Sequence, residues 1–390
     1  MGRNFRDAVA IAGVAESEVG ILPHRTEMQL HAQAAKRALD DAGIALSEVD
    51  GVLSIGSSRG TRMPSVQVAE YLGITPTYSD STSLGGCSFE AYVQHAALAI
   101  DAGLCSTCLI TYGSTQRSGG AGFGGGTDPW LAEPQFETPW GLPMMTGAYA
   151  LAAARHMHLY GTTREQLAEI AVAARAWACL NPDAPRRDPL SVAEVLAAPM
   201  IATPLGKYDC CLVTDGGGAV VVTRADRACD TRKPPVWLWG SAEAHTHASI
   251  ANMPDLTVTP AARTGPAAFK SAGLAPADMD LAMIYDSFTI TPVLALEDLG
   301  FAARGVVAQD GHQAGVFTLR AGVGLHADGV EAGNRLEVVG QPVDHLDVAL
   351  GLLARREGVQ VGERRPGHRD HLAGGVELHG AAAQRDHRMV

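Results

Sequence analysis

Residues Thr82–Gly103 read TSLGGCSFEAYVQHAALAIDAG and place a cysteine between a glycine turn and a helical pattern. Gly85 and Gly86 allow the tight turn that presents the side chain of Cys87 at the start of a helix. The unpaired backbone N–H groups and the dipole at such a helix start favour a thiolate. Cys87 is therefore a candidate nucleophile, although the spacing alone also allows a small buried side chain at a turn.

Short apolar segments alternate with helical patterns on both sides of this stretch. The expected strands are 8–15, 49–57, 108–114 and 217–224, and the expected helices are 26–43, 64–73 and 88–102. Thr26 is the expected N-cap of the first helix, and Gly43 is its expected C-terminal stop. This alternation predicts an α/β fold with a largely parallel sheet and helices on both faces.

The same alternation restarts after the linker-like segment 231–235. Strands are expected at 236–244 and 280–288, and helices are expected at 260–273 and 291–301. A long insert, about 118–204, lies within the first half and contains two helical patterns. The predicted organisation is two similar halves, 1–230 and 235–301, followed by a C-terminal segment, 302–390.

Composition excludes several classes of function. The chain has 390 residues, a net charge of −12, 46% hydrophobic and 18% charged residues, which suits a well-buried globular protein and argues against nucleic-acid binding. No signal segment or membrane span is expected, so we expect a cytoplasmic protein with seven reduced cysteines. Cys105 and Cys108 form a C-x-x-C without further ligands, so we expect packing there and no metal site.

Several motifs resemble those of the thiolase superfamily, and most closely its sterol carrier protein thiolase and lipid-transfer-protein branch. The opening stretch, extended to Ser118, resembles the nucleophile segment of that family. DCCLVTDGGGAVVVT (Asp209–Thr223) resembles its glycine-rich segment, and RHMHLYGTTREQLAEIAV (155–172) is typical of the branch. IYDSFTI (Ile284–Ile290) matches a strand-end motif that reads Asn-Glu-Ala-Phe in ordinary thiolases and His-Asp-Cys-Phe in the branch. The resemblance runs from about residue 8 to Phe301.

The resemblance implies a five-layered αβαβα fold, usually dimeric, and acyl-CoA chemistry. In this family a cysteine takes an acyl group as a thioester and passes it to a carbon nucleophile. Cys87 would be that nucleophile in an acyl-CoA C-acyltransferase of the acetyl-CoA acetyltransferase type. Coenzyme A thioesters would be the substrates, and we expect no separate cofactor.

Tyr285 stands where the Claisen enzymes have Asn or His, and a tyrosine there resembles the lipid-transfer-protein aldolases. These cleave a side-chain CoA thioester by retro-aldol chemistry with an OB-fold partner protein. The Tyr285 phenol would act as acid or base, with Asp286 and Ser287 orienting a water or a loop. His156 and His158 are expected near the acyl channel. Packing of the Tyr285 ring and ordinary surface or packing roles for the histidines are the alternatives.

The resemblance ends after Phe301. A thiolase continues with a Gly-His-Pro-x-Gly loop carrying a catalytic histidine and with a final Cys-x-Gly segment, and this sequence has neither. His312, in GHQAG (Gly311–Gly315), is the nearest candidate for the missing histidine. A non-catalytic or broken member of the family is therefore a third interpretation.

The residue types after Phe301 suggest why the motifs are missing. Nearly all of them are encoded by codons that begin with G or C, and the exceptions are Phe317, Thr318, Asn334 and Met389. A GC-rich gene translated out of frame, or from its opposite strand, produces this pattern. We therefore predict that residues 302–390 lie outside the reading frame of the family and are poorly ordered. A genuinely evolved tail is the alternative.

Overall fold

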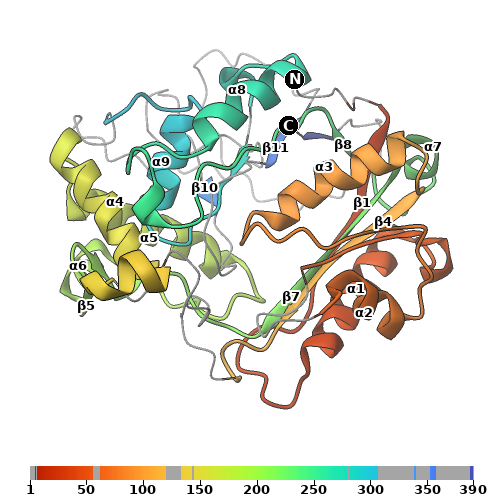
Figure 1. The fold of residues 1–390 in the computed structure, drawn as a ribbon, viewed down its shortest axis with the longest axis horizontal. Helices are drawn as coiled ribbons and strands as arrows, with labels where there is room; N and C mark the ends of the chain where they lie inside the picture. The colour runs from red at the N-terminus through yellow and green to blue at the C-terminus, as the bar shows by residue number, and fades with distance from the viewer. Residues whose placement is uncertain are drawn as a thin grey trace, which may run out of the picture.

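The computed structural model describes Phe5 and residues 7–55, 62–119, 133–142, 145–279, 281–305, 338–339, 352–356 and 387–389. Within these ranges, ten strands form a mixed sheet in the order β10-β9-β11-β12-β8-β1-β7-β4-β2-β3. Helices pack on both faces of the sheet (Figure 1). The predicted α/β class is confirmed.

The first half supplies the longest strands. Its strands are β1 (Val9–Glu16), β2 (Gly51–Leu53), β3 (Tyr78–Asp80), β4 (Thr107–Ser114) and β7 (Gly216–Arg224), and its helices are α1 (Glu27–Ala42), η1 (Leu46–Glu48), α2 (Pro64–Leu72), α3 (Ser88–Asp101) and α7 (Ala225–Ala228). Figure 1 shows α1 and α2 on one side of β1, β7 and β4, and α3 on the other side.

Helix α1 begins and ends as the sequence predicts. The Thr26 hydroxyl accepts the N–H of Gln29, whose side chain accepts the N–H of Thr26, which completes a capping box. Gly43 ends the helix in the left-handed conformation, with φ 70°. The helix packs closely on β4, because a Cβ at Gly113 would lie 2.5 Å from the Glu27 carbonyl oxygen.

The expectation of a largely parallel sheet was wrong for the centre of the sheet. β7 pairs antiparallel with both β1 and β4, whereas β2 pairs parallel with β3 and β4. The last residue of β4, Ser114, pairs with the first residue of β7, Gly216, so β7 begins beside the end of β4 and runs antiparallel to it. The insert connects these two strand ends. Because the chain re-enters the sheet at the end where β4 leaves it, β7 runs in the opposite direction to β4.

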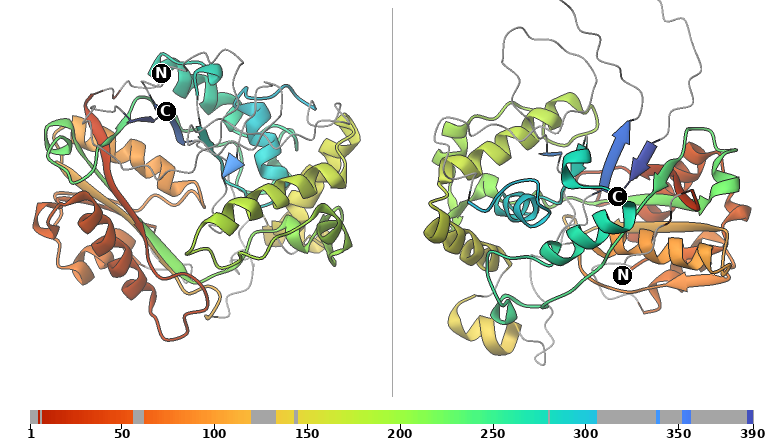
Figure 2. Two further views of the ribbon diagram at one scale, coloured as in Figure 1. Left: turned by 180° about the vertical axis from the view of Figure 1, so that it is seen from behind. Right: turned by 90° about the horizontal axis from the view of Figure 1, so that it is seen from above.

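The insert forms a separate layer beside the sheet, and Figure 2 shows it from two further directions. Its elements are η2 (Glu133–Glu137), η3 (Thr138–Trp140), α4 (Met145–Tyr160), α5 (Arg164–Leu180), α6 (Val192–Ala197), β5 (Met200–Ala202), β6 (Leu205–Gly206) and η4 (Lys207–Asp209). A second capping box, between Thr163 and Gln166, starts α5 where the sequence predicts it.

The second half has much shorter strands. It comprises β8 (Val236–Leu238), η5 (Ile250–Asn252), α8 (Ala261–Ala272), η6 (Pro276–Asp278), β9 (Leu281–Met283) and α9 (Ile290–Asp298). Its core is built by Trp239, Phe269, Met279, Ile284 and Leu296. No helix among the described residues is long and apolar enough to cross a membrane.

Three short strands of the C-terminal segment join the sheet of the second half. They are β10 (Val338–Val339), β11 (Leu352–Arg356) and β12 (His387–Met389), which pair with β9 and β8 and with each other. Most of the segment 302–390, including His312, lies outside the described residues. The departure from the family reading frame therefore stays a prediction.

Candidate active site

A cavity of about 1690 Å³ separates the sheet of the first half from the insert. Its lining comes from β1, β4 and β7, from α5 and the segment after it, from the segment before β7, from Phe89 of α3 and from the loop before α9. The apolar lining residues include Val14, Ile110, Tyr112, Ile170, Trp177 and Val220. A large apolar space with a few polar groups is the usual form of a small-molecule site.

Cys87 lies directly before α3, as the sequence predicts. The turn is held by Ser88, whose hydroxyl donates to the Gly85 carbonyl at 2.7 Å and accepts the Leu84 N–H at 2.8 Å. The Cys87 thiol donates to the Leu84 carbonyl at 3.0 Å and is 9% exposed. Cys87 is absent from the cavity lining. The nucleophile role of Cys87 therefore stays a prediction.

The loop between β9 and α9 carries Tyr285, Asp286 and Ser287 and is tied to the segment before β7. The Cys211 N–H donates to the Ser287 carbonyl at 3.0 Å. Thr289 donates its N–H to the Asp209 carbonyl at 3.0 Å and its hydroxyl to the Asp209 carboxylate at 2.8 Å. These bonds fix the loop at the edge of the cavity.

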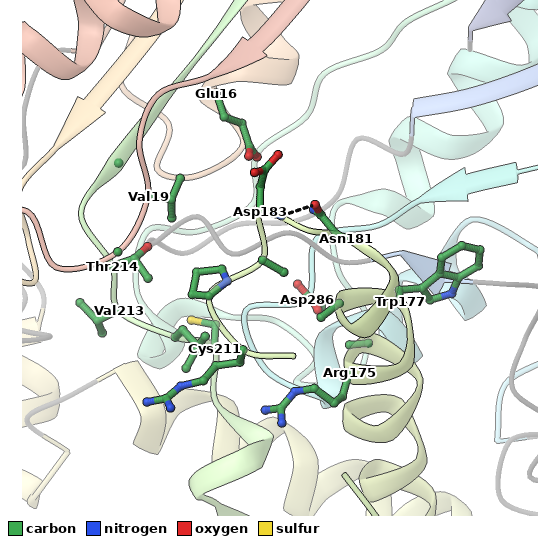
Figure 3. A pocket seen from close by; sticks show the side chains of 18 of the residues that line it. Glu16, Val19, Arg175, Trp177, Asn181, Asp183, Cys211, Val213, Thr214 and Asp286 are labelled. Carbon is green, nitrogen blue, oxygen red and sulfur yellow. Dashed lines mark hydrogen bonds between the residues drawn. The ribbon is translucent and has the colours of Figure 1, made fainter. Parts of the chain in front are cut away.

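Asp286 is the predicted site residue that lines the cavity. Figure 3 draws it among the lining side chains, together with Cys211 and Trp177. Burial raises the pKa of the Asp286 carboxyl to about 6. A carboxylate with this pKa is ionised at neutral pH and is a stronger base than an ordinary aspartate, so it suits general-base catalysis.

Tyr285 and Ser287, the sequence neighbours of Asp286, do not line the cavity. The Tyr285 hydroxyl oxygen is buried, and Tyr285 is not in the cavity lining. The Ser287 hydroxyl is buried within 3.1 Å of the Thr291 hydroxyl, across the start of α9. Ser287 therefore holds the loop to its helix, and substrate binding by Ser287 stays a prediction.

His156 is fully buried between α4 and α9. Its Nδ1 lies 2.7 Å from the Thr162 hydroxyl, and its Nε2 lies 3.1 Å from the Glu297 carboxylate. Both ring nitrogens are thus used in a network that joins the insert to the second half. His158 follows two residues later on the same helix, and neither histidine lines the cavity. Their expected place near the acyl channel stays a prediction.

Glu90 is a candidate that the sequence did not reveal. It lies in the first turn of α3, three residues after Cys87, and burial raises the pKa of its carboxyl to about 7. Its Oε2 is buried without a hydrogen-bond partner among the described residues. The sequence contains one signal for Glu90, which is its position one helical turn after Cys87, because positions i and i+3 share a helix face.

Charged groups of both signs line the cavity. Figure 3 shows Glu16 and Asp183 directed toward one another, and the pKa of Glu16 is raised by burial and by the charge of Asp183. The cationic lining residues are Arg117, Arg175, Arg186 and Lys207. Arg175 donates to the Asp188 carbonyl at 2.8 Å and lies apart from the Glu16–Asp183 pair in Figure 3. Across the described ranges, no three His, Cys, Asp or Glu side chains gather as a metal site.

Comparisons with known proteins agree with the motifs. A family model for the thiolase C-terminal domain matches residues 242–321, and so extends past Phe301. A steroid side-chain-cleaving aldolase of Thermomonospora curvata is 31% identical over 322 residues, covering 76% of this chain and 79% of that protein. An acetyl-CoA acetyltransferase of Methanothermobacter thermautotrophicus is 31% identical over 307 residues, covering 76% of this chain and 78% of that protein.

A solved structure shares the fold. The Ltp2-ChsH2(DUF35) aldolase is 30% identical, has a TM-score of 0.71, and is matched over 78% of this chain and 80% of that chain. Two of these relatives are named as aldolases and one as an acetyl-CoA acetyltransferase, so their names cover both activities expected from the sequence.

Proposed function

We propose that this chain, which belongs to the thiolase superfamily and to its sterol carrier protein thiolase-like branch, is a coenzyme A thioester aldolase. The observation that carries the proposal is the position of Asp286, which lines the cavity and whose carboxyl has a pKa raised to about 6 by burial. An aldolase needs a base that reaches the substrate, whereas a Claisen enzyme needs a nucleophilic thiolate there. The Cys87 thiol instead donates to a backbone carbonyl.

The reaction follows from the chemistry of these groups. In a β-hydroxyacyl-CoA, the Asp286 carboxylate takes the proton of the hydroxyl group. The hydroxyl carbon becomes a carbonyl as the Cα–Cβ bond breaks, and the bonding electrons move into the thioester enolate. The α carbon takes a proton from water, and the hydroxide that remains accepts the proton held by Asp286. A role of Tyr285 as acid or base stays a prediction. The products are a ketone and a shortened acyl-CoA, and no cofactor is consumed.

The size and charge of the cavity support a bulky CoA thioester as substrate. A volume of about 1690 Å³ exceeds the usual range of about 300–1,000 Å³ for small-molecule pockets. The apolar lining suits a fused-ring group such as the steroid in the name of the T. curvata relative. Arg175, Arg186 and Lys207 would bind the phosphates of coenzyme A, because guanidinium and ammonium groups pair with phosphate oxygens.

We also propose that this chain associates with other protein chains. The structural relative with a TM-score of 0.71 is an aldolase whose title includes ChsH2(DUF35). We propose that this chain also works with an OB-fold partner protein of that kind, and that it forms a homodimer. Size-exclusion chromatography with light scattering, on the chain alone and co-expressed with such a partner, tests both statements.

A second candidate is the acyl-CoA C-acyltransferase with Cys87 as nucleophile. The position of Cys87 at the start of α3 favours it, since a helix N-terminus lowers the pKa of a thiol. The third interpretation, an inactive copy, depends on the segment 302–390. Translation of the coding DNA across codons 290 to 390 in all six frames would show whether another frame encodes the Gly-His-Pro and Cys-x-Gly motifs.

The products of the reaction test the proposal. The chain, with its partner protein, is incubated in D₂O with the CoA thioester of a steroid side chain bearing a β-hydroxyl group, and products are identified by mass spectrometry. We expect a steroid ketone and a shortened acyl-CoA with one deuterium on its α carbon, without consumption of free coenzyme A. Cleavage of a β-ketoacyl-CoA that consumes free coenzyme A, with an acyl group on Cys87, would instead identify the acyltransferase.

A further inference from the structure

Cys105 and Cys108 lie far along the chain from the proposed reaction residues, at the point where the chain enters β4. Their sulfur atoms are 3.3 Å apart, and both side chains are buried. Cys105 belongs to the short connection after α3, and Cys108 is the second residue of β4. We propose that this pair is a dithiol that oxidises to an intramolecular disulfide in the folded protein.

The neighbouring strand makes room for the two sulfurs. Gly51 of β2 lies opposite Cys108 in the parallel register. A Cβ at Gly51 would lie 2.5 Å from the Cys108 sulfur and 3.3 Å from the Cys105 sulfur. The absence of a side chain at this position therefore lets both sulfurs occupy one space beside the strand. A disulfide occupies less of that space than two separate thiols.

The backbone between the two cysteines is held in place. The Asp50 carboxylate accepts the N–H of Ser106 at 2.8 Å and the N–H of Thr107 at 2.8 Å. The four-residue segment is thus fixed from Cys105 to Cys108 by a group outside it. Formation of the disulfide requires approach of the sulfurs and no refolding of the connection.

The two thiols differ in acidity. The hydrogen bond from the Cys108 thiol lowers the pKa of Cys105, and the same bond together with burial raises the pKa of Cys108. Cys105 is therefore the attacking thiolate, and Cys108 is the thiol that completes the bond. Cys105 is also nearer to solvent, since its side chain is 6% exposed whereas that of Cys108 is 0% exposed.

The oxidant would be a low-molecular-weight disulfide such as glutathione disulfide. The Cys105 thiolate attacks one sulfur of the oxidant and releases one glutathione thiolate, which leaves a mixed disulfide on Cys105. Cys108 then loses its proton to solvent and displaces the second glutathione. Two protein thiols are oxidised, one glutathione disulfide is reduced to two glutathiones, and one Cys105–Cys108 bond forms.

The experiment uses the full chain with no mutation. The reduced protein is incubated with glutathione disulfide, the remaining thiols are blocked with iodoacetamide, and the protein is cleaved after glutamate and arginine. Cleavage after Glu90 and Arg117 separates Cys87 from the pair. We expect the peptide 91–117 to be about 2 Da lighter than its reduced form, with no alkylation and no glutathione attached. Dithiothreitol should restore both alkylation sites.

Exposed cysteines of the same chain provide the control. Cys179 and Cys229 are exposed and should each carry a glutathione as a mixed disulfide. The variant Cys108→Ser should stop at a glutathione adduct on Cys105, with the folded state checked by circular dichroism. The proposal is overturned if Cys105 and Cys108 of the unmutated chain are both alkylated after Cys179 and Cys229 have reacted, or if Cys105 retains glutathione while Cys108 is alkylated.

Discussion

The turn before α3 and the loop after β9 each carry a residue suited to catalysis, and the protein holds these residues in different ways. In the first half, the Cys87 thiol donates to the Leu84 carbonyl and is 9% exposed. In the second half, Asp286 lines a cavity of about 1690 Å³. The family motif indicates Cys87 as the reacting residue, whereas the local environment favours Asp286 in that role.

The two halves also differ in how they are stabilised. β1, β4 and β7 have eight, eight and nine residues and pair along most of their length. β8 and β9 have three residues each, and the second half contacts the insert through a buried polar network around Glu297. The proposed base, Asp286, therefore lies in the half with the shorter strands.

The largest effect on stability is expected at Glu297. Its carboxylate accepts the His156 ring N–H and the Gly305 N–H at 2.8 Å, and its side chain is fully buried. Glu297→Ala leaves these donors unsatisfied and should lower the free energy of unfolding by about 3–5 kcal/mol in urea denaturation. The exposed Glu165→Ala is the control, with a change within about 0.5 kcal/mol. Equal losses for both variants would show that the network does not join the insert to the second half.

Asp286→Asn should stabilise the protein at neutral pH. Because burial raises the pKa of Asp286 to about 6, the folded state binds this proton more tightly than the unfolded state. The contribution of Asp286 to stability is thus fully present below pH about 4 and is lost as pH rises through about 6. Asparagine, which does not ionise, should raise the free energy of unfolding at pH 7 by up to about 3 kcal/mol and leave it nearly unchanged at pH 3.5. A loss of stability at pH 7 would mean that the carboxylate is well solvated or paired.

Two adjacent glycines of β7 test the packing of the first half. A Cβ at Gly217 would lie 2.4 Å from the Tyr112 carbonyl oxygen, whereas at Gly218 the nearest atom is 3.9 Å away. Gly217→Ala should therefore lower the free energy of unfolding by about 1–3 kcal/mol. Gly218→Ala should change it by less than about 0.5 kcal/mol, measured by thermal or urea unfolding. Similar values for the two variants would contradict the tight pairing of β4 and β7.

The rate of cleavage should follow the ionisation of Asp286. With a pKa of about 6, the carboxylate is the major form at pH 8 and a minor form at pH 5. The rate at pH 5 should therefore be about tenfold lower than at pH 8. Glu90→Gln is the control, because burial raises the pKa of that carboxyl to about 7 and it is a separate group. A midpoint that moves in Glu90→Gln would assign the titration to Glu90.

Local signals in the sequence predict much of the fold. The capping boxes at Thr26 and Thr163 and the glycine stop at Gly43 give the ends of α1 and the start of α5, because these signals lie within one helical turn of the residues they position. The strand directions in the centre of the sheet were predicted wrongly. Pairing of β7 with β4 depends on where the chain returns after the insert, and no local pattern encodes that return.

The candidate site is only partly predictable from the sequence, because several of its properties depend on contacts that form on folding. The motif at 284–290 identifies Asp286, and the glycine turn identifies the helix start at Cys87. The hydrogen bond of the Cys87 thiol and the burial of Glu90 depend on contacts made by the folded turn. Whether a residue faces the cavity is decided by tertiary packing, so the relative importance of Cys87 and Asp286 emerges from the structure.

Two variants measured side by side distinguish Asp286 from Cys87 as the reacting residue. Asp286→Asn and Cys87→Ala are assayed for ketone release from the same steroid CoA thioester, with circular dichroism to confirm folding. We predict that Asp286→Asn lowers kcat by about 10²–10⁴-fold, the usual contribution of a general base, and that Cys87→Ala stays within about threefold of the unmutated chain, since small core changes are tolerated at a buried cysteine. Retention of activity in Asp286→Asn together with its loss in Cys87→Ala would exclude Asp286 as the base and identify the thiol as the reacting group.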